Sequence, residues 1–341
     1  MWEVIGQEGA VSLLKHSLAS GRLSHAYLIV GPPHVGKMTL ALNLAQALNC
    51  EAEDKPCLNC DSCKKIKENK HSDVQVIGLT RDEEDTEAKS IHTEQIKGII
   101  YDSSLPPFEG KYKVFIIDGA ELLSNEAANR LLKTLEEPEA KIVFILLSTN
   151  EKRLLKTVVS RCQRIELKPM PLAEEAKVLT EKFGASAEQA RLLAGLSHGC
   201  LGGAITTKND EKILTRRQET LDEIINMIKG DSEGRFAYVA KLAADFTKNR
   251  QAVYDTLEMW VDFWRDLLLV KLDCTDIITN IDRQDNLTKM AANLSLSQIR
   301  NCIQSIESAA VQLKQNVNTR LALEVMMLDL PKLEVKVSPV V

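Results

Sequence analysis

The sequence has few aromatic residues, no long apolar run and no excess of positive charge. Aromatic side chains make up 4% of the 341 residues, whereas Leu, Ala, Ile and Lys are abundant, which favours helices. No run of about 18 apolar residues is present, so we expect no membrane-spanning helix. The first residues lack the charged start and apolar core of a secretory signal. The formal net charge of −5 excludes a generally basic nucleic-acid binder, so any DNA contact must come from a local patch or from partners.

Four of the eight cysteines lie close together, in the pattern Cys50-x6-Cys57-x2-Cys60-x2-Cys63. Four thiolates without a histidine suit tetrahedral Zn²⁺, so we expect these cysteines to hold a closed, structural zinc site. An iron–sulfur cluster or free thiols are the alternatives. Clustered cysteines in a chain without a secretory signal also indicate a reducing compartment, the cytoplasm. The remaining cysteines are isolated and are expected to be small buried hydrophobic residues: Cys162, Cys200, Cys274 and Cys302.

The first half of the chain alternates between short apolar runs and helical patterns. Runs that are almost entirely apolar are typical of strands buried on both faces of a parallel sheet. We therefore expect four strands, with helices as the crossover connections, at His25–Val30, Asp73–Leu79, Lys113–Glu121 and Lys141–Thr149. One connecting helix has Ser124 as its N-cap residue and extends to Pro138. The acidic run from Arg81 to Lys89 is expected to be an exposed loop.

Helical patterns occupy the second half. Pro169 and Pro171 precede short helices, and a continuous helical pattern begins at about residue 209. Trp260 and Trp264 lie on a helix that is apolar over much of its circumference, which favours an ordinary core position; a subunit interface is the alternative. We therefore expect an α/β domain over residues 1–168, a small helical lid over 169–208 and a helical domain over 209–341.

A glycine-rich loop, Gly31-Pro-Pro-His-Val-Gly36-Lys37, follows the first expected strand and opens a helix, as a phosphate-binding loop does. Its backbone N–H groups and the helix N-terminus would face a polyphosphate, and Lys37 would reach the β and γ phosphates. The next residue should carry a hydroxyl for Mg²⁺, but it is Met38. Thr39 is a poor substitute, because one step along a helix turns the side chain by about 100°. A vestigial loop that binds nothing is the alternative.

The ends of the third and fourth expected strands supply the other candidate groups. Asp118 is placed to hold Mg²⁺ through water, or is an ordinary strand-end residue. ATPases of this type have a water-activating Glu next, but here Gly119 follows, and the nearest carboxylate is Glu121. Thr149 and Asn150 would sense the γ phosphate or form an ordinary turn. We expect binding of ATP or ADP with Mg²⁺ and little hydrolysis, through Gly31, Pro32, His34, Val35, Gly36, Lys37, Met38, Thr39 and Asp118.

The order of these motifs resembles the AAA+ clamp-loader subunits of bacterial DNA polymerase III. Between Met1 and about Gly203 the chain contains, in order, GPPHVGK, the four cysteines, VFIIDGAELLS, NRLLKTLEEP, FILLSTN and SRC. The resemblance implies a RecA-like AAA+ domain with a zinc module, a lid, and a collar domain that joins a hetero-pentamer. It implies ATP-dependent loading of the sliding clamp onto primed DNA during replication, with indirect contact to the clamp and weak contact to DNA.

Within that family the chain looks like the delta-prime, or stator, type, with gamma/tau and delta types as partners. Motor subunits of the gamma or tau type have Thr, Glu and Arg where this chain has Met38, Gly119 and Gly202. The arginine of the family's SRC motif enters the neighbouring subunit's ATP site, and by motif match it is Arg161. The alternatives are a gamma/tau-type motor subunit, a free-standing ATP-dependent enzyme, and a zinc-centred binding module with an inert nucleotide fold.

Overall fold

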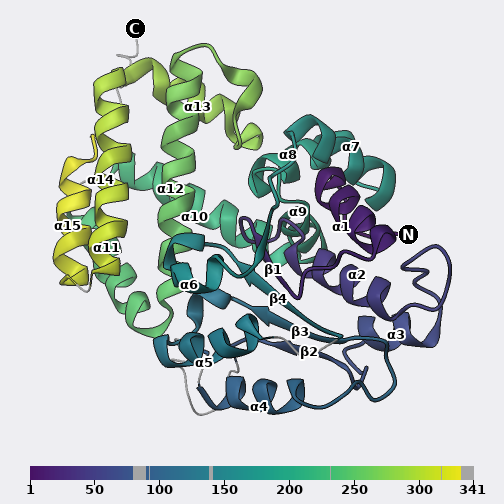
Figure 1. The fold of residues 1–341 in the computed structure, drawn as a ribbon. Coiled ribbons are helices and arrows are strands. Elements are labelled where there is room, and N and C mark those ends of the chain that lie inside the picture. The colour runs from purple at the N-terminus through teal and green to yellow at the C-terminus, as the bar shows by residue number, and fades with distance from the viewer. Residues whose placement is uncertain (80–89, 92, 138–140, 231, 316, 332–341) are drawn as a thin grey trace, which may run out of the picture. The chain divides into compact units, whose positions relative to one another are not determined.

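The computed structural model describes residues 1–79, 90–91, 93–137, 141–230, 232–315 and 317–331 (Figure 1). The chain forms two compact units, Met1–Pro171 with Gly199–Gly203, and Leu172–His198 with Ala204–Val341. The finer division into three domains stays a prediction. The acidic run at 81–89 and Pro138 lie outside the described residues. Within the described ranges, no helix combines the length and the apolar character needed to cross a membrane.

A parallel five-stranded sheet forms the centre of the first unit, in the order β2-β3-β4-β1-β5. Its strands are β1 (Ala26–Val30), β2 (Val74–Ile77), β3 (Lys113–Asp118), β4 (Ile142–Ser148) and β5 (Gln163–Glu166). β1 and β4 are buried along their whole length, and β3 up to its last residue. Such burial is typical of a parallel sheet covered on both faces, so the predicted α/β class is confirmed.

The edge strand β5 is an element that the sequence pattern did not predict. It pairs with β1, and Ile165 lies opposite Ile29. Ile165 is the single buried residue of its four, because the strand has only one paired neighbour and its other side chains face solvent. A strand of this kind lacks the continuous apolar run by which the four other strands were recognised.

Helices cover both faces of the sheet. They are α1 (Glu8–Ser20), α2 (Lys37–Asn49), α3 (Asp61–Lys67), α4 (Thr93–Ser103), α5 (Asn125–Glu136) and α6 (Lys156–Val159). Tyr27 and Ile29 of β1 belong to the core on the side of α1 and α2, and Leu28 to the core on the side of α4 and α5. The predicted N-cap of α5 is confirmed, because Ser124 Oγ accepts a hydrogen bond from Ala127 N. Two 3₁₀ helices, η1 (Ala120–Leu122) and η2 (Glu151–Arg153), follow β3 and β4.

The second unit is helical throughout its described residues. Its helices are α7 (Leu172–Phe183), α8 (Ala187–Ser197), α10 (Glu211–Lys229), α11 (Ser232–Lys248), α12 (Arg250–Lys271), α13 (Gln284–Asn293), α14 (Leu296–Lys314) and α15 (Thr319–Asp329), with two 3₁₀ helices, η3 (Thr275–Ile277) and η4 (Ile281–Arg283). Helix α9 (Leu201–Asn209) begins in the first unit and continues in the second. Trp260 and Trp264 are fully buried, so the prediction of a core position is confirmed and the interface alternative is wrong.

Candidate phosphate-binding loop, zinc site and arginine finger

The loop between β1 and α2 contains two residues in the left-handed backbone region. His34 and Gly36 have positive φ angles of 61° and 103°. A Cβ atom at Gly31 would lie 2.7 Å from the carbonyl oxygen of Leu167, so glycine permits a close approach of the chain after β5. The loop therefore joins a buried strand to the N-terminus of a helix, where backbone N–H groups bind anions.

Lys37 lies inside this loop. Its side chain is almost fully buried, and Nζ donates to the carbonyl oxygens of Gly31 and Pro32, each at 2.7 Å. Burial lowers the pKa of Lys37, while the carboxylates of Glu121 and Asp118 oppose that shift. Asp118 is the last residue of β3 and Glu121 lies in the 3₁₀ helix after it, where the sequence placed the acidic side of the site.

Three residues close to Lys37 in sequence contribute differently. Val35 is buried, and Met38 packs against the core under the sheet rather than offering a ligand atom. Thr39 is partly buried. The loop therefore has the glycines and the lysine of the predicted pattern, but residue 38 carries no hydroxyl.

The structure pairs two residues at the ends of β3 and β4 whose contact the sequence did not indicate. Glu121 Oε1 accepts hydrogen bonds from the hydroxyl and from the amide of Thr149, the latter at 3.0 Å. Burial raises the pKa of Glu121, but hydrogen bonds from Thr149, from the Glu121 amide and from Ser148 together outweigh it and hold that pKa below its ordinary value. Glu121 Oε2 is buried without a hydrogen-bond partner among the described residues. The expected sensing side chain, Thr149, is therefore bound to a carboxylate, and Asn150 caps η2 through Lys152 N.

Gly202 lies where the resemblance expects the lid arginine of a motor subunit. Its N–H donates to the carbonyl oxygen of His34 at 3.0 Å, and a Cβ atom would lie 2.7 Å from that oxygen. The segment Gly199–Gly203, which belongs to the first unit, therefore rests directly on the loop. A larger residue at 202 would displace the loop backbone.

The four clustered cysteines are brought together as predicted. Their sulfur atoms all lie within 4.8 Å of one another. A tetrahedral zinc ion with Zn–S bonds of about 2.3 Å requires sulfurs about 3.8 Å apart, so Cys50, Cys57, Cys60 and Cys63 fit this metal with little adjustment. Cys57 N donates to Cys50 Sγ and Cys60 N to Cys57 Sγ, the kind of contact that stabilises bound thiolates. Backbone amides of Asn59 and Cys60 lower the pKa of Cys57 to about 6, which favours the metal-binding thiolate.

The isolated cysteines agree only in part with the prediction of burial. Cys200 and Cys302 are buried, Cys162 is partly exposed, and Cys274 is exposed just after α12. Burial raises the pKa of the Cys162 and Cys302 thiols to about 12. The prediction is therefore wrong for Cys274, because the chain leaves the helical core at that point.

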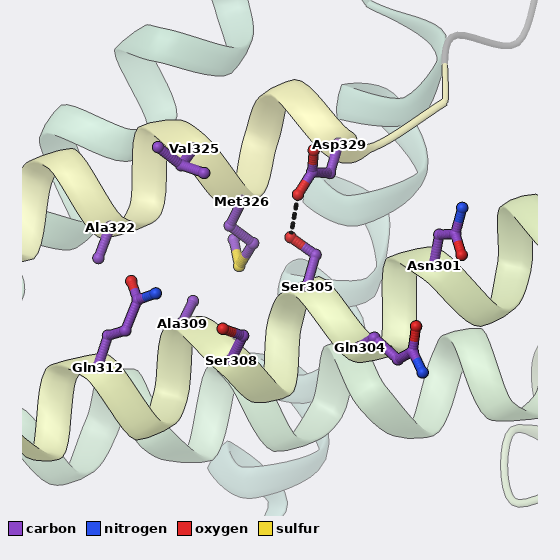
Figure 2. A pocket seen from close by; sticks show the side chains of 10 residues that line it. All are labelled: Asn301, Gln304, Ser305, Ser308, Ala309, Gln312, Ala322, Val325, Met326 and Asp329. Atoms are coloured by element: carbon purple, nitrogen blue, oxygen red, sulfur yellow. Dashed lines mark hydrogen bonds between the residues drawn. The ribbon is translucent and has the colours of Figure 1, made fainter.

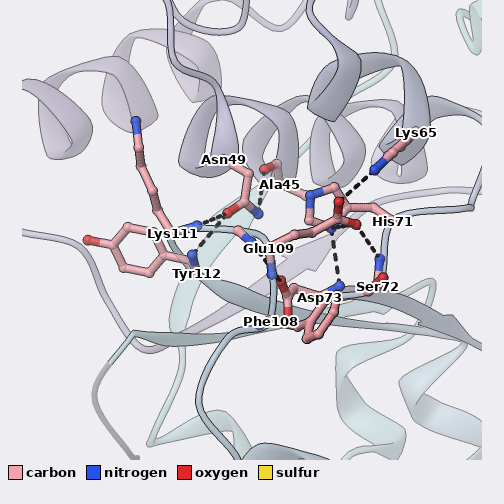
Figure 3. Close-up of polar contacts among 11 residues, drawn as sticks. Ala45, Asn49, Lys65, His71, Ser72, Asp73, Phe108, Glu109, Lys111 and Tyr112 are labelled. Atoms are coloured by element: carbon pink, nitrogen blue, oxygen red, sulfur yellow. Dashed lines mark hydrogen bonds and ion pairs between the residues drawn. The ribbon is translucent and has the colours of Figure 1, made fainter.

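Two buried polar residues fix the chain segment that precedes β3 (Figure 3). Asn49, at the end of α2, accepts hydrogen bonds through Oδ1 from Lys111 N at 2.8 Å and Tyr112 N at 2.9 Å. Asp73 accepts hydrogen bonds from the three backbone amides of residues 108–110. Both residues fix the chain before β3 against α2 and β2. No sequence pattern marks them, since their partners lie dozens of residues away.

Arg161 lies at the surface between α6 and β5. Its Nη1 donates to the carbonyl oxygen of Thr157 at 2.9 Å, and its Nη2 donates to Glu136 Oε1. The side chain is 32% exposed, so the guanidinium group is both held and accessible.

Two family models match the chain. The model described as DNA polymerase III, delta subunit, matches residues 6–171, and the one described as DNA polymerase III, delta subunit, C terminal, matches residues 212–332. The chain belongs to the DNA polymerase III delta-subunit family. These two matches cover both compact units of this delta-family chain, the α/β unit and most of the helical one.

Individual relatives refine this placement of the delta-family chain. The delta-prime subunit of Bacillus subtilis is 29% identical over 327 residues, which are 95% of this chain and 96% of that subunit. A tau/gamma subunit of Haemophilus influenzae is 27% identical across 96% of this chain but 48% of its own length. A DNA polymerase III gamma-subunit-related protein of Thermotoga maritima superposes with a TM-score of 0.49 at 18% identity, covering 92% of this chain and 97% of that one. The match to the delta-prime subunit along both full lengths favours the delta-prime type, and that prediction is confirmed.

Proposed function

We propose that this chain acts as the stator subunit of a DNA polymerase III clamp loader and assists ATP-dependent loading of the sliding clamp onto primed DNA. The observation that carries the proposal is the match to a delta-prime subunit over 95% of this chain and 96% of that subunit. Its partners would be gamma/tau-type and delta-type subunits in a hetero-pentamer. Contact with the clamp would be indirect, contact with primed DNA weak, and the compartment the cytoplasm, where thiolates stay reduced.

The phosphate-binding loop supports nucleotide binding without efficient hydrolysis. Backbone amides and Lys37 would face the phosphates of ATP or ADP, and Asp118 would face Mg²⁺. Met38 supplies no hydroxyl, and Gly119 supplies no carboxylate. Gly119 has a φ angle of 75°, in the left-handed region. A glutamate at this position would therefore have a strained backbone. These differences argue against the motor alternative.

Zinc would be held by four thiolates and would act structurally. A site closed by Cys50, Cys57, Cys60 and Cys63 leaves no coordination position for a substrate. When bound, the ion would stabilise the module that follows Asn49, at the end of α2.

Arg161 would act in the ATP site of the neighbouring subunit. A planar, permanently charged guanidinium suits charge that develops on a γ phosphate. The partial exposure of Arg161, together with its place after α6, supports this role.

The face of α14 and α15 offers a surface for the helical domain of a neighbouring subunit. Leu321, Val325 and Leu328 recur at helical spacing on α15 and are 56%, 50% and 68% exposed. Such an apolar stripe is typical of a surface that packs against another helix. Polar side chains line the pocket beside it, between α14 and α15 (Figure 2): Asn301, Gln304, Ser305, Ser308 and Gln312.

The test is the primed-DNA-stimulated ATPase of a clamp loader reconstituted with this chain, comparing wild type with Arg161→Ala, beside the isolated chain. We expect the isolated chain to be inert. The Arg161→Ala complex should assemble, while hydrolysis at the adjacent site falls by on the order of 10³-fold. Saturable ATPase of the isolated chain, together with an unaffected Arg161→Ala complex, would replace this proposal with the gamma/tau-type motor alternative.

A further inference from the structure

The guanidinium group of Arg161 is fixed by acceptors from two different helical segments. Its Nη1 donates to the carbonyl oxygen of Thr157 at 2.9 Å, with a longer bond to Ser160 Oγ at 3.4 Å. Its Nη2 donates to Glu136 Oε1. Acceptors on two nitrogens of a planar group determine the orientation of its plane as well as the position of its charge.

Glu136 lies where helix electrostatics disfavour a carboxylate. It is the last residue of α5, and the C-terminal turn of a helix carries partial negative charge. Its side chain is 48% exposed, so the ion pair with Arg161 adds little to the free energy of folding. A contribution to folding stability therefore does not explain why a carboxylate stands at position 136. Its effect on the orientation of Arg161 explains it better.

The ion pair leaves part of Arg161 free to bind an anion. An arginine side chain has five N–H donors, and the three described bonds use three of them. With the side chain 32% exposed, a phosphate from another subunit can meet the remaining donors while Glu136 and the Thr157 carbonyl still hold the group.

We infer that Glu136 is a positioning residue that holds Arg161 in the orientation in which it enters the neighbouring subunit's ATP site. The inference rests on the proposed role of Arg161. Glu136 itself does not touch the nucleotide. An arginine that is charged but free to rotate would stabilise the transition state less well, because misplacing a catalytic group by about 1 Å can lower a rate by about 10²-fold.

The experiment uses the reconstituted clamp loader with the full chain and measures steady-state ATPase on primed DNA. Glu136→Gln and Glu136→Ala should each lower kcat by on the order of tenfold and leave KM for ATP unchanged, since the finger acts on the transition state. Glu136→Asp, which keeps the charge, should restore part of kcat. Glu137→Gln is the matched control: it removes the next carboxylate, which makes no described hydrogen bond to Arg161, and should retain the wild-type rate.

A double-mutant comparison separates the inference from the proposal beneath it. In an Arg161→Ala complex, Glu136→Gln should cause no further loss, because the group that it positions is gone. If Arg161→Ala slows the complex while Glu136→Gln leaves kcat unchanged or raises it, Glu136 does not position the finger and the inference is overturned, although the finger stands. If Arg161→Ala has no effect, both the finger and the inference fail.

Discussion

The cysteine module and the candidate phosphate-binding loop lie at the two ends of one helix and differ in how many of the expected groups they contain. Helix α2 begins at Lys37, in the loop, and ends at Asn49, next to Cys50. The module has every part of a structural zinc site, with four sulfurs within 4.8 Å and backbone amides that donate to two of them. The loop has its glycines and lysine, but no hydroxyl at Met38.

This difference shows that the backbone conformation of a site and its reactive side chains can depend on separate structural causes. The loop backbone has a packing role, because the Gly202 N–H donates to His34 and the chain after β5 approaches Gly31 closely. Its shape therefore does not require a hydroxyl at position 38. Cys50 and Cys63 are fully buried, and a closed site of four ligands depends on each thiolate. The two sites should consequently respond very differently to single substitutions.

Cys60→Ser should have the largest effect, because it removes one of four ligands from a closed site. We expect loss of stoichiometric zinc and destabilisation of the α/β unit by about 4 kcal/mol, as is typical when a structural metal is lost. The helical unit should keep its circular dichroism signal. Metal analysis and thermal unfolding test this, with the exposed Cys274→Ser as control. One zinc ion per chain in Cys60→Ser would contradict the ligand set.

Asn49→Ala should come next, since it disturbs the point where the module meets α2. The Asn49 side chain is buried, and its removal leaves the amides of Lys111 and Tyr112 without their acceptor. We expect a loss of about 3 kcal/mol in the free energy of unfolding, measured by chemical denaturation. Asn125→Ala, at an exposed position of α5, is the control. Equal stability of the two variants would mean that this anchor has no energetic role.

Met38→Thr should sharpen the comparison by supplying the missing hydroxyl. We expect magnesium-dependent nucleotide binding to tighten by on the order of tenfold, the value of one contact to a charged group worth about 1.4 kcal/mol. Hydrolysis should remain slow, because Gly119 is unchanged. Met38→Val is the matched control, since valine has nearly the shape of threonine without the hydroxyl. Calorimetry in Mg²⁺ and in EDTA measures the difference, and identical behaviour of the two variants would identify the loop as vestigial.

The smallest effect should appear at acid pH and should come from Asp73. Burial raises the pKa of Asp73, but the backbone amides of residues 108–110 outweigh it and hold that pKa below its ordinary value. Since the folded pKa is depressed, the stabilisation is present above the unfolded pKa of about 3.9 and is lost as pH falls through the folded pKa. Denaturation midpoints between about pH 5 and pH 3 should fall more steeply for wild type than for Asp73→Asn. The exposed Asp61→Asn should retain the wild-type slope.

Local patterns in the sequence were sufficient for much of the fold. Four strands are continuous apolar runs, Ser124 caps a helix next to it, and four cysteines lie within a short segment. Each of these signals depends on neighbouring residues alone. β5 was not predicted, because its exposed Arg164 and Glu166 flank a single buried residue. This strand is defined by its pairing with β1 rather than by its composition.

The missed parts of the candidate site depend on contacts between distant positions. Glu121 and Thr149 are 28 residues apart, and Glu136 and Arg161 are 25 residues apart. All four residues lie within the motifs named above, but no motif indicates which of them touch, because the sheet and its connections bring the partners together. The sequence motif alone selected Arg161 but said nothing about the carboxylate that holds it.

Helix α2 has a practical consequence for work on the purified protein. Its 13 residues form a stiff rod about 20 Å long, with the lysine of one site at its start and the first cysteine of the other just past its end. A shift of the cysteine end on oxidation or chelation would displace the lysine end as well. Nucleotide affinity should therefore co-vary with metal content from one preparation to another, and a zinc-depleted sample would be a misleading standard for whether the loop binds nucleotide.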